Sequence, residues 1–375
     1  MKKILTIIGA RPQFVKAAIL SRLIRSDEWK ALFHETILHT GQHYDENMSE
    51  IFFRDMQIPK PDIQLHIGGT THGAMTGQML IEIEAALIRV KPDMVLVYGD
   101  TNSTLAGALA ASKLNIPIAH VESGLRSYNM RMPEEQNRIL TDHLATWLFC
   151  PTVTAVKNLS REGIASGLYQ VGDIMLDATL FYQRVLAIEE QQGKNRLSNL
   201  NLKHIPEYFL LATIHRAENT DNITRLTQIV EALNEVSCDI ILPLHPRTRK
   251  KLSESNIVLG DNITAIEPIG YLEMLALELR AEAIITDSGG VQKEAYFLRK
   301  PCITLRDETE WIETLENGWN ILVGADKEKI INTCNLKETP INQSNFFGTG
   351  DTGSKVLKRL YGLNDFMLPI TLSTT

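Results

Sequence analysis

Short apolar runs recur along the chain, and amphipathic stretches separate them. In the first half the runs lie at 3–8, 35–39, 93–98, 117–121 and 145–150. In the second half they lie at 209–214, 240–244, 263–266, 283–286, 302–305 and 321–323. Strands that are apolar at every position are covered on both faces, which indicates parallel sheets joined by helices. We therefore predict an α/β fold with two Rossmann-like domains that face each other across a cleft.

The length of the chain supports two domains, because a domain typically has about 100–200 residues and this chain has 375. The repeating pattern loosens around residues 170–205, and the polar stretch 191–198 is a predicted linker or surface loop. We predict a first domain over 1–172 and a second domain over 173–353.

Composition and charge exclude several classes of protein. Hydrophobic residues make up 44% of the chain and charged residues 22%, as in soluble globular proteins. The net charge of −7 argues against a nucleic-acid or membrane partner. The four cysteines form no CxxC pair, and no apolar run reaches the length of about 18 residues that a membrane span needs. We therefore expect a cytoplasmic protein with reduced thiols.

Motifs for cofactors and metals are missing from the sequence. The first apolar run is followed by Gly9-Ala-Arg-Pro and not by GxGxxG, which argues against a nicotinamide cofactor. The chain has no P-loop signature, no HExxH and no DxD pair. We therefore expect no cofactor and no bound metal.

The stretch Ala283–Glu294 predicts a strand, a tight turn and the start of a helix. Ser288 suits the helix cap, and Gly289 and Gly290 allow a ligand to approach the backbone. Free N–H groups and the positive end of the helix dipole would bind a phosphate, and Glu294 is placed to accept hydrogen bonds from a ribose. An ordinary capped turn is the alternative interpretation.

Carboxylates follow several predicted strands of the first half. Asp100, Glu122 and Glu134 would form one group, and carboxylates that crowd each other suit general acid–base work. Structural alternatives are a helix cap for Asp100 and a favourable first-turn acid for Glu134.

Basic residues follow strands in both halves. His215 and Arg216 come after the run 209–214 and could support the charge of a departing phosphate, whereas a hydrogen-bonded structural histidine is the alternative for His215. His245 begins a basic segment whose alternative is an exposed loop. Arg11, Lys16 and Arg126 supply cations in the first half.

In this order and spacing the motifs are specific, and the chain resembles the non-hydrolysing UDP-N-acetylglucosamine 2-epimerases along almost its whole length. The matching motifs are Gly9-x-Arg11-Pro with Lys16, Gly99-Asp100-Thr, His120-Val-Glu122-x-Gly-Leu-Arg126, Pro133-Glu134-Glu-x-Asn-Arg138, His215-Arg216, Thr286-Asp-Ser-Gly-Gly-x-Gln-x-Glu294 and Arg306-Asp-x-Thr-Glu310. The resemblance implies a fold of GT-B type, a homodimer, and a C-terminal helix within 354–375 that packs on the first domain.

The resemblance also implies a mechanism. UDP leaves C1 while the C2 proton is removed, and UDP adds back to the 2-acetamidoglucal after protonation of the opposite face. The implied catalytic residues are Asp100, Glu122, Glu134 and His215. The implied substrate-binding residues are Arg11, Lys16, Arg126, Arg216, His245, Ser288, Gly289, Gly290 and Glu294.

Two departures bear on the substrate. Common members of the family carry Arg where this chain has Trp311, and Glu where it has Lys293. Trp311 and the segment Thr40–Met48 look more like the branch that acts on UDP-2,3-diacetamido-2,3-dideoxy-glucuronic acid for lipopolysaccharide O-antigen. We favour that substrate, and UDP-N-acetylglucosamine is the alternative. A GT-B glycosyltransferase, a hydrolysing epimerase and a non-catalytic nucleotide-sugar binding protein stay as competing hypotheses.

Overall fold

The computed structural model describes residues 1–42, 56–200, 205–335 and 340–363. The chain divides into two compact units. Unit 1 is Met1–Ala178 together with Phe347–Thr375, and unit 2 is Thr179–Phe346. Among the described residues, no helix is both long enough and apolar enough to cross a membrane.

The core of unit 1 is a seven-stranded sheet in the order β3-β2-β1-β4-β5-β6-β7. Its strands are β1 (Lys2–Ile8), β2 (Phe33–His39), β3 (Ile63–Gln64), β4 (Met94–Tyr98), β5 (Ile118–Val121), β6 (Trp147–Cys150) and β7 (Leu168–Gln170). Every pair of neighbouring strands is parallel. This is the strand order of a doubly wound Rossmann sheet.

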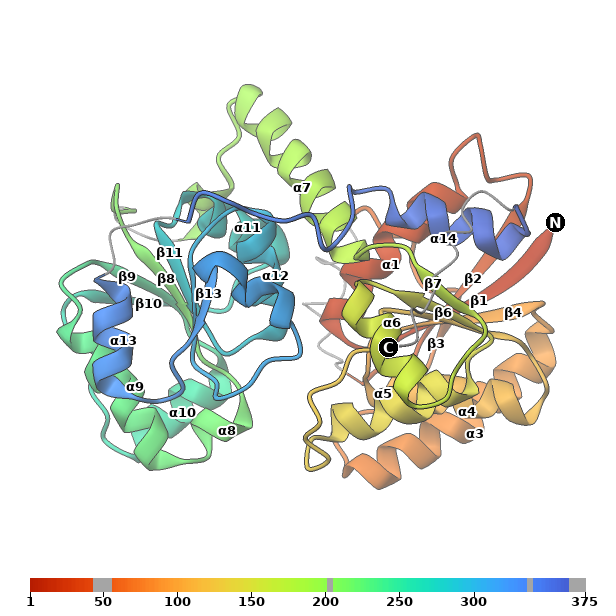
Figure 1. Cartoon of the computed structure of the whole chain (residues 1–375), viewed down its shortest axis with the longest axis horizontal. Coiled ribbons are helices and arrows are strands. Elements are labelled where there is room, and N and C mark those ends of the chain that lie inside the picture. Colours follow the sequence, from red (N-terminus) through yellow and green to blue (C-terminus); the bar gives the residue numbers. More distant parts are fainter. Residues whose placement is uncertain (43–55, 201–204, 336–339, 364–375) are drawn as a thin grey trace, which may run out of the picture. The chain divides into compact units, whose positions relative to one another are not determined.

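Helices cover both faces of this sheet, as Figure 1 shows. They are α1 (Arg11–Ile24), α3 (His72–Val90), α4 (Asn102–Lys113), α5 (Pro133–Leu144), α6 (Val153–Arg161), the start of α7 (Ile174–Gln191) and α14 (Thr352–Tyr361). Helices α3, α4 and α5 lie on one face, with α1 and α14 on the other. A Cβ atom on Gly107 of α4 would lie 2.8 Å from Cδ1 of Ile7, so the glycine lets this helix pack closely on β1. Likewise, a Cβ atom on Gly353 of α14 would lie 2.6 Å from Cδ1 of Leu23 in α1.

Unit 2 repeats the same plan with a six-stranded sheet in the order β10-β9-β8-β11-β12-β13. The strands are β8 (Leu210–Thr213), β9 (Ile240–Pro243), β10 (Ile263–Ile266), β11 (Ala283–Thr286), β12 (Cys302–Thr304) and β13 (Asn320–Leu322). The helices are α8 (Ala217–Thr220), α9 (Ile223–Glu235), α10 (Pro246–Glu254), α11 (Tyr271–Arg280), α12 (Gly289–Phe297) and α13 (Lys327–Cys334), with the 3₁₀ segments η1 (Arg196–Leu200) and η2 (Ile312–Gly318). All strand pairs are parallel. One apolar core joins the sheet to α9 and α13, and another joins it to α11 and α12.

The predicted α/β class with two Rossmann-like domains is confirmed, and the predicted strands overlap the observed ones. The expectation of a loosened pattern after residue 170 is wrong for 174–191, where α7 is an 18-residue helix. The division between the units falls inside this helix, after Ala178, whereas the predicted boundary was at residue 172. Strands β3 and β7 were not predicted, because each is short, includes a glutamine and lies in no run of three consecutive apolar residues.

Candidate active site

In each sheet the strand order reverses at one point, and open α/β sheets bind ligands beyond the carboxyl ends of the strands at such a point. In unit 1 the reversal lies between β1 and β4, and in unit 2 between β8 and β11. Gly9 and Gly99 follow the first pair, while Ile214 and Asp287 follow the second. Most predicted site residues lie on these exits or on the helices that start there.

A buried glutamine, which the sequence did not reveal, ties the two exits of unit 1 together. The side-chain oxygen of Gln13 accepts a hydrogen bond from Gly9 N at 2.8 Å, and its amide nitrogen donates to the carbonyl oxygen of Tyr98 at 2.8 Å. Gln13 is only 1% exposed. Because a buried amide held from both ends has little freedom, the two loops keep a fixed separation.

Lys16 of α1 and Glu122, which follows β5, form a buried ion pair. The two residues are 7% and 8% exposed. A Cβ atom on Gly99 would lie 3.2 Å from Oε2 of Glu122 and 3.3 Å from Nζ of Lys16, so the pair lies directly against the turn after β4. The structure thus brings together two of the predicted site residues, and the ammonium offsets the cost of burying the carboxylate.

The backbone of Glu122 is in the left-handed region, with φ at 73°. Its N–H donates to the carbonyl oxygen of Phe149 at 3.1 Å, as does the N–H of Ser123. Non-glycine residues rarely adopt this conformation, and such strained residues cluster at functional sites. The strain therefore supports a functional role for Glu122.

Asp100 is held from α5. Its Oδ2 atom lies 2.5 Å from Nη2 of Arg138, and its carbonyl oxygen accepts a hydrogen bond from Nδ2 of Asn137 at 2.9 Å. The cap of α4 is Thr101, whose hydroxyl accepts from Thr104 N, so the capping alternative for Asp100 is wrong. Its carboxylate is instead 30% exposed, which leaves it accessible to a ligand.

Glu134 is the second residue of α5, one turn before Arg138, and its side chain is half-buried. The neighbouring Glu135 is fully buried and accepts hydrogen bonds from the backbone N–H groups of Ser127 and Tyr128, at 3.0 and 2.8 Å. Glu135 thus has a structural role, while Glu134 makes no side-chain hydrogen bond among the described residues. Arg11 is the first residue of α1.

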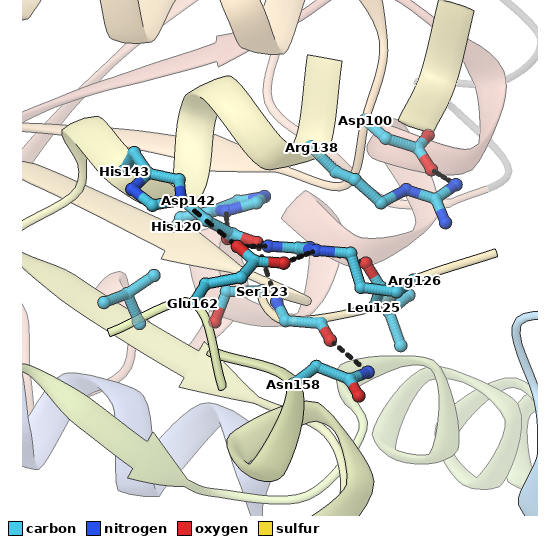
Figure 2. Close-up of polar contacts among 12 residues, drawn as sticks. Asp100, His120, Ser123, Leu125, Arg126, Arg138, Asp142, His143, Asn158 and Glu162 are labelled. Atoms are coloured by element: carbon cyan, nitrogen blue, oxygen red, sulfur yellow. Dashed lines mark hydrogen bonds and ion pairs between the residues drawn. The ribbon is translucent and has the colours of Figure 1, made fainter. Parts of the chain in front are cut away.

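Arg126 is engaged with the protein, as Figure 2 shows. Its Nη1 atom lies 2.7 Å from Oδ2 of Asp142, and its Nε and Nη2 atoms contact the carboxylate of Glu162 at 2.6 and 2.8 Å. Burial opposes ionisation of Asp142, but hydrogen bonding to His120 and the charge of Arg126 hold its pKa below the usual value. These contacts favour a supporting role for Arg126 over the direct substrate contact that we predicted.

In unit 2 the predicted strand–turn–helix around Ser288 is confirmed. Ser288 caps α12, because its hydroxyl accepts a hydrogen bond from Val291 N at 3.5 Å. A Cβ atom on Gly289 would lie 2.4 Å from Oε1 of Glu310 and 3.2 Å from Nε1 of Trp311, so a larger residue there would displace the Glu310 side chain. A Cβ atom on Gly290 would have Oγ of Ser288 as its nearest neighbour, at 3.8 Å, and this position is exposed.

Asp287 joins the two exits of unit 2, a role that we did not assign from the sequence. Its fully buried carboxylate accepts hydrogen bonds from the backbone N–H groups of His215 and Arg216 at 3.0–3.1 Å. Nδ1 of His215 lies 3.2 Å from the same carboxylate, and 41% of the His215 side chain is exposed. Desolvation by the surrounding chain outweighs the attraction of Asp287 and lowers the pKa of His215.

His245, at the start of α10, is exposed, and its ring centre lies 6.4 Å from that of His215.

Glu294 of α12 is buried beside two groups from α11. Burial and the negative charge of Glu294 raise the pKa of Glu278 well above its usual value. Burial and the charges of both glutamates also raise the pKa of Tyr271. The part of the chain that the structure describes contains no group of three or more His, Cys, Asp or Glu side chains that could hold a metal ion.

Two parallel α/β units with polar residues at the strand reversals define the class of GT-B type nucleotide-sugar enzymes. The family model described as UDP-N-acetylglucosamine 2-epimerase matches residues 27–361. The chain belongs to this family, as its motifs predicted, and it is an isomerase of the UDP-sugar 2-epimerase class.

Relatives and solved structures agree with this assignment. A UDP-2,3-diacetamido-2,3-dideoxy-D-glucuronate 2-epimerase from Pseudomonas aeruginosa is 51% identical over 370 residues, which cover 96% of this chain and 99% of the relative. The crystal structure of a UDP-GlcNAc 2-epimerase from Methanocaldococcus jannaschii, in complex with UDP-GlcNAc and UDP, is 47% identical with a TM-score of 0.86, covering 96% of this chain and 99% of that one. A UDP-GlcNAc 2-epimerase from Neisseria meningitidis bound to UDP-GlcNAc is 30% identical with a TM-score of 0.83, and 96% of this chain and 99% of that chain are covered.

Proposed function

We propose that the protein is a non-hydrolysing epimerase that inverts C2 of a UDP-2-acetamido sugar. The observation that carries this proposal is the buried Lys16–Glu122 pair against Gly99, with Glu122 in a strained backbone conformation. A carboxylate held in this way beside the Asp100 turn suits proton transfer at a carbon atom better than it suits a surface role.

The chemistry requires elimination, because no carbonyl group adjoins C2 and its proton is not acidic. A base takes the C2 proton while the C1–O bond breaks, and UDP leaves with the electron pair of that bond, which gives a glycal with a C1–C2 double bond. An acid then protonates C2 on the opposite face, and an oxygen of UDP attacks C1. The acids and bases are drawn from Asp100, Glu122 and Glu134.

Unit 2 holds the UDP group in this proposal. The free N–H groups at the start of α12 and the narrow space at Gly289 suit a diphosphate. Glu294 accepts hydrogen bonds from the ribose, and His215 assists the departure of UDP. The remaining residues proposed to contact the substrate are Arg11, Lys16, Arg216, His245, Ser288 and Gly290.

We favour UDP-2,3-diacetamido-2,3-dideoxy-glucuronate as the substrate and its manno epimer, a precursor for O-antigen, as the product. The choice rests on the resemblance at Trp311, and the two positions that depart from common members of the family contact each other. The ammonium of Lys293 lies 3.7 Å from the ring centre of Trp311, and both residues are buried. UDP-N-acetylglucosamine, converted to UDP-N-acetylmannosamine, is the alternative, since relatives named for that substrate are of similar identity. The segment Thr40–Met48, which also suggested the first branch, lies mostly outside the described residues.

Proton NMR in deuterium oxide with each UDP-sugar, and with no acceptor present, tests the proposal. We expect deuterium at C2 of the diacetamido uronate together with its manno epimer. Exchange only with UDP-N-acetylglucosamine would establish the alternative substrate. Release of free sugar would show a hydrolysing epimerase, and no exchange with either sugar would contradict the proposal.

We also propose that the protein acts as a homodimer. Ile81 and Ile88 lie two turns apart on α3 and are 66% and 58% exposed. Large apolar side chains on one exposed helix face are typical of an interface. Sedimentation velocity tests this directly, and a monomer at micromolar concentration would contradict it.

A further inference from the structure

Helix α5 contacts the turn that carries Asp100 at three points. Arg138 pairs with the carboxylate of Asp100 at 2.5 Å, and Asn137 donates to the carbonyl oxygen of Asp100 at 2.9 Å. The third contact runs through His120, whose Nε2 atom lies 2.7 Å from the carbonyl oxygen of Gly99. Nδ1 of His120 lies 2.7 Å from Oδ1 of Asp142 on α5.

The His120 ring is fixed from both sides. It is fully buried, and each of its nitrogens faces an oxygen atom, the Gly99 carbonyl on one side and the Asp142 carboxylate on the other. A carbonyl oxygen only accepts hydrogen bonds, so Nε2 is the donor toward Gly99, while Nδ1 lies within hydrogen-bond distance of the Asp142 carboxylate. Asp142 is itself held by Arg126 at 2.7 Å, as Figure 2 shows. It also accepts a hydrogen bond from the backbone N–H of Gly124 at 3.1 Å.

The spacing along α5 explains why one helix makes all three contacts. Arg138 and Asp142 are four residues apart, which places them on the same face of the helix. Asn137, Arg138 and Asp142 are all buried. Glu134 precedes Arg138 by four residues and lies on the same face.

We propose that α5 positions the carboxylate of Asp100 for proton transfer. Its positioning residues are Asn137, Asp142 and, through Asp142, His120. By holding the carbonyl oxygens of Gly99 and Asp100, they fix the peptide planes on both sides of the Asp100 Cα atom. The side chain then leaves the backbone in one direction, toward Arg138 and the open side of the turn. This inference rests on the proposed epimerase function.

The main test is Asp142→Asn, because an amide keeps the size but accepts at one oxygen only. His120, Arg126 and the backbone N–H of Gly124 all contact the carboxylate of Asp142. An amide offers one acceptor atom fewer, so the His120 ring loses its fixed partner in the variant. Displacement of a reacting group by about 1 Å costs about 100-fold, and we expect kcat to fall by about 10- to 100-fold. KM for the UDP-sugar should stay within about threefold, because the variant affects a step after binding. UDP affinity, measured by calorimetry, should stay in the same range.

The matched control is Thr141→Val on the same helix. Thr141 is fully buried, and its hydroxyl has no hydrogen-bond partner among the described residues. Valine has the same shape, so the control should keep kcat while it perturbs the same packed face. Equal loss in Thr141→Val and Asp142→Asn would show a general packing effect and overturn the proposal.

Asn137→Ala provides a second, independent variant. It removes the hydrogen bond to the Asp100 carbonyl oxygen and leaves His120 and Asp142 in place. If Asp142→Asn does not fold, as judged by thermal unfolding, this variant decides alone. A folded positioning variant with the kcat of the wild type would overturn the proposal. Wild-type protein that exchanges no C2 proton would instead refute the epimerase function, so the two failures are distinguishable.

Discussion

Lys16 and Glu122 form an ion pair whose partners come from the first helix of unit 1 and from the exit of β5, about a hundred residues later. Both side chains are buried, and the backbone of Glu122 is left-handed. Removing one partner of a buried pair leaves an uncompensated charge, which costs about 3–5 kcal/mol. The pair therefore holds the carboxylate of Glu122 in place against the turn after β4.

Glu122→Gln should abolish deuterium exchange at C2, because an amide cannot take the proton. UDP affinity should stay within a few-fold, since the UDP group is assigned to unit 2. Glu35→Gln is a matched control, because Glu35 is also a buried carboxylate of unit 1, hydrogen-bonded to Thr6 at 2.7 Å. Exchange is measured by proton NMR in deuterium oxide. Persistent exchange in Glu122→Gln would remove this residue from the mechanism.

Gly289→Ala and Gly290→Ala form a second pair of variants. The new methyl group at 289 would lie 2.4 Å from Glu310, whereas at 290 the nearest atom is 3.8 Å away. Gly289→Ala should cost about 1–3 kcal/mol of stability through overpacking and should weaken UDP binding at least about tenfold. Gly290→Ala should leave stability nearly unchanged. Calorimetric titration with UDP and urea unfolding check this, and equal effects of the two variants would contradict the geometry.

Trp311→Arg would place a guanidinium beside the buried ammonium of Lys293, so it should destabilise unit 2 strongly. Adding Lys293→Glu should restore an attractive pair. We expect a coupling free energy of about 1–3 kcal/mol in a double-mutant cycle by urea unfolding. The double variant should also shift C2 exchange toward UDP-N-acetylglucosamine. Strictly additive effects would show that the two positions do not act together.

Glu278 has no hydrogen-bond partner for either carboxylate oxygen among the described residues. Its raised pKa means that the folded protein retains a proton which the unfolded chain loses, so stability should fall as pH rises above the unfolded value. Glu278→Gln removes this dependence on pH. As pH rises, the free energy of unfolding of the variant should therefore gain on that of the wild type by up to about 1.4 kcal/mol per pH unit. Urea unfolding at pH 6, 7 and 8 measures it. Glu282→Gln, at an exposed position, is the control. If the free energies of unfolding of the wild type and of Glu278→Gln changed in parallel with pH, the prediction would be refuted.

Asp177 accepts hydrogen bonds from the backbone N–H groups of Thr352 and Gly353 at the start of α14, at 3.1 and 2.8 Å. Burial nevertheless raises its pKa to about 6. The pKa of Asp177 is higher in the folded protein than in the unfolded chain, so the protonated carboxyl group stabilises the fold. This stabilisation is fully present below about pH 4 and is lost as pH rises toward 6. Asp177→Asn should flatten the stability profile between pH 4 and pH 6. An unchanged slope in thermal unfolding would contradict the assignment.

The sequence predicted the strands well where every position was apolar, since such runs allow little except a buried parallel strand. It also predicted the capped turn at Ser288, because Ser-Gly-Gly after an apolar run is a local signal. The helix α7 was missed because polar residues interrupt its apolar ones, so whether this segment is helical depends on its packing against the rest of the chain. Strands β3 and β7 were missed because neither lies in a continuous apolar run.

Local sequence patterns specify the α/β class, the order of the strand exits and the types of side chain that follow them. The tertiary structure alone decided which of those side chains meet. It paired Lys16 with Glu122, engaged Arg126 with Asp142 and Glu162, and placed Gln13, Asp142 and Asp287 as links between loops. The physical reason is that hydrogen bonds and ion pairs between residues far apart in the chain depend on how the helices pack on the sheet, which no local pattern records.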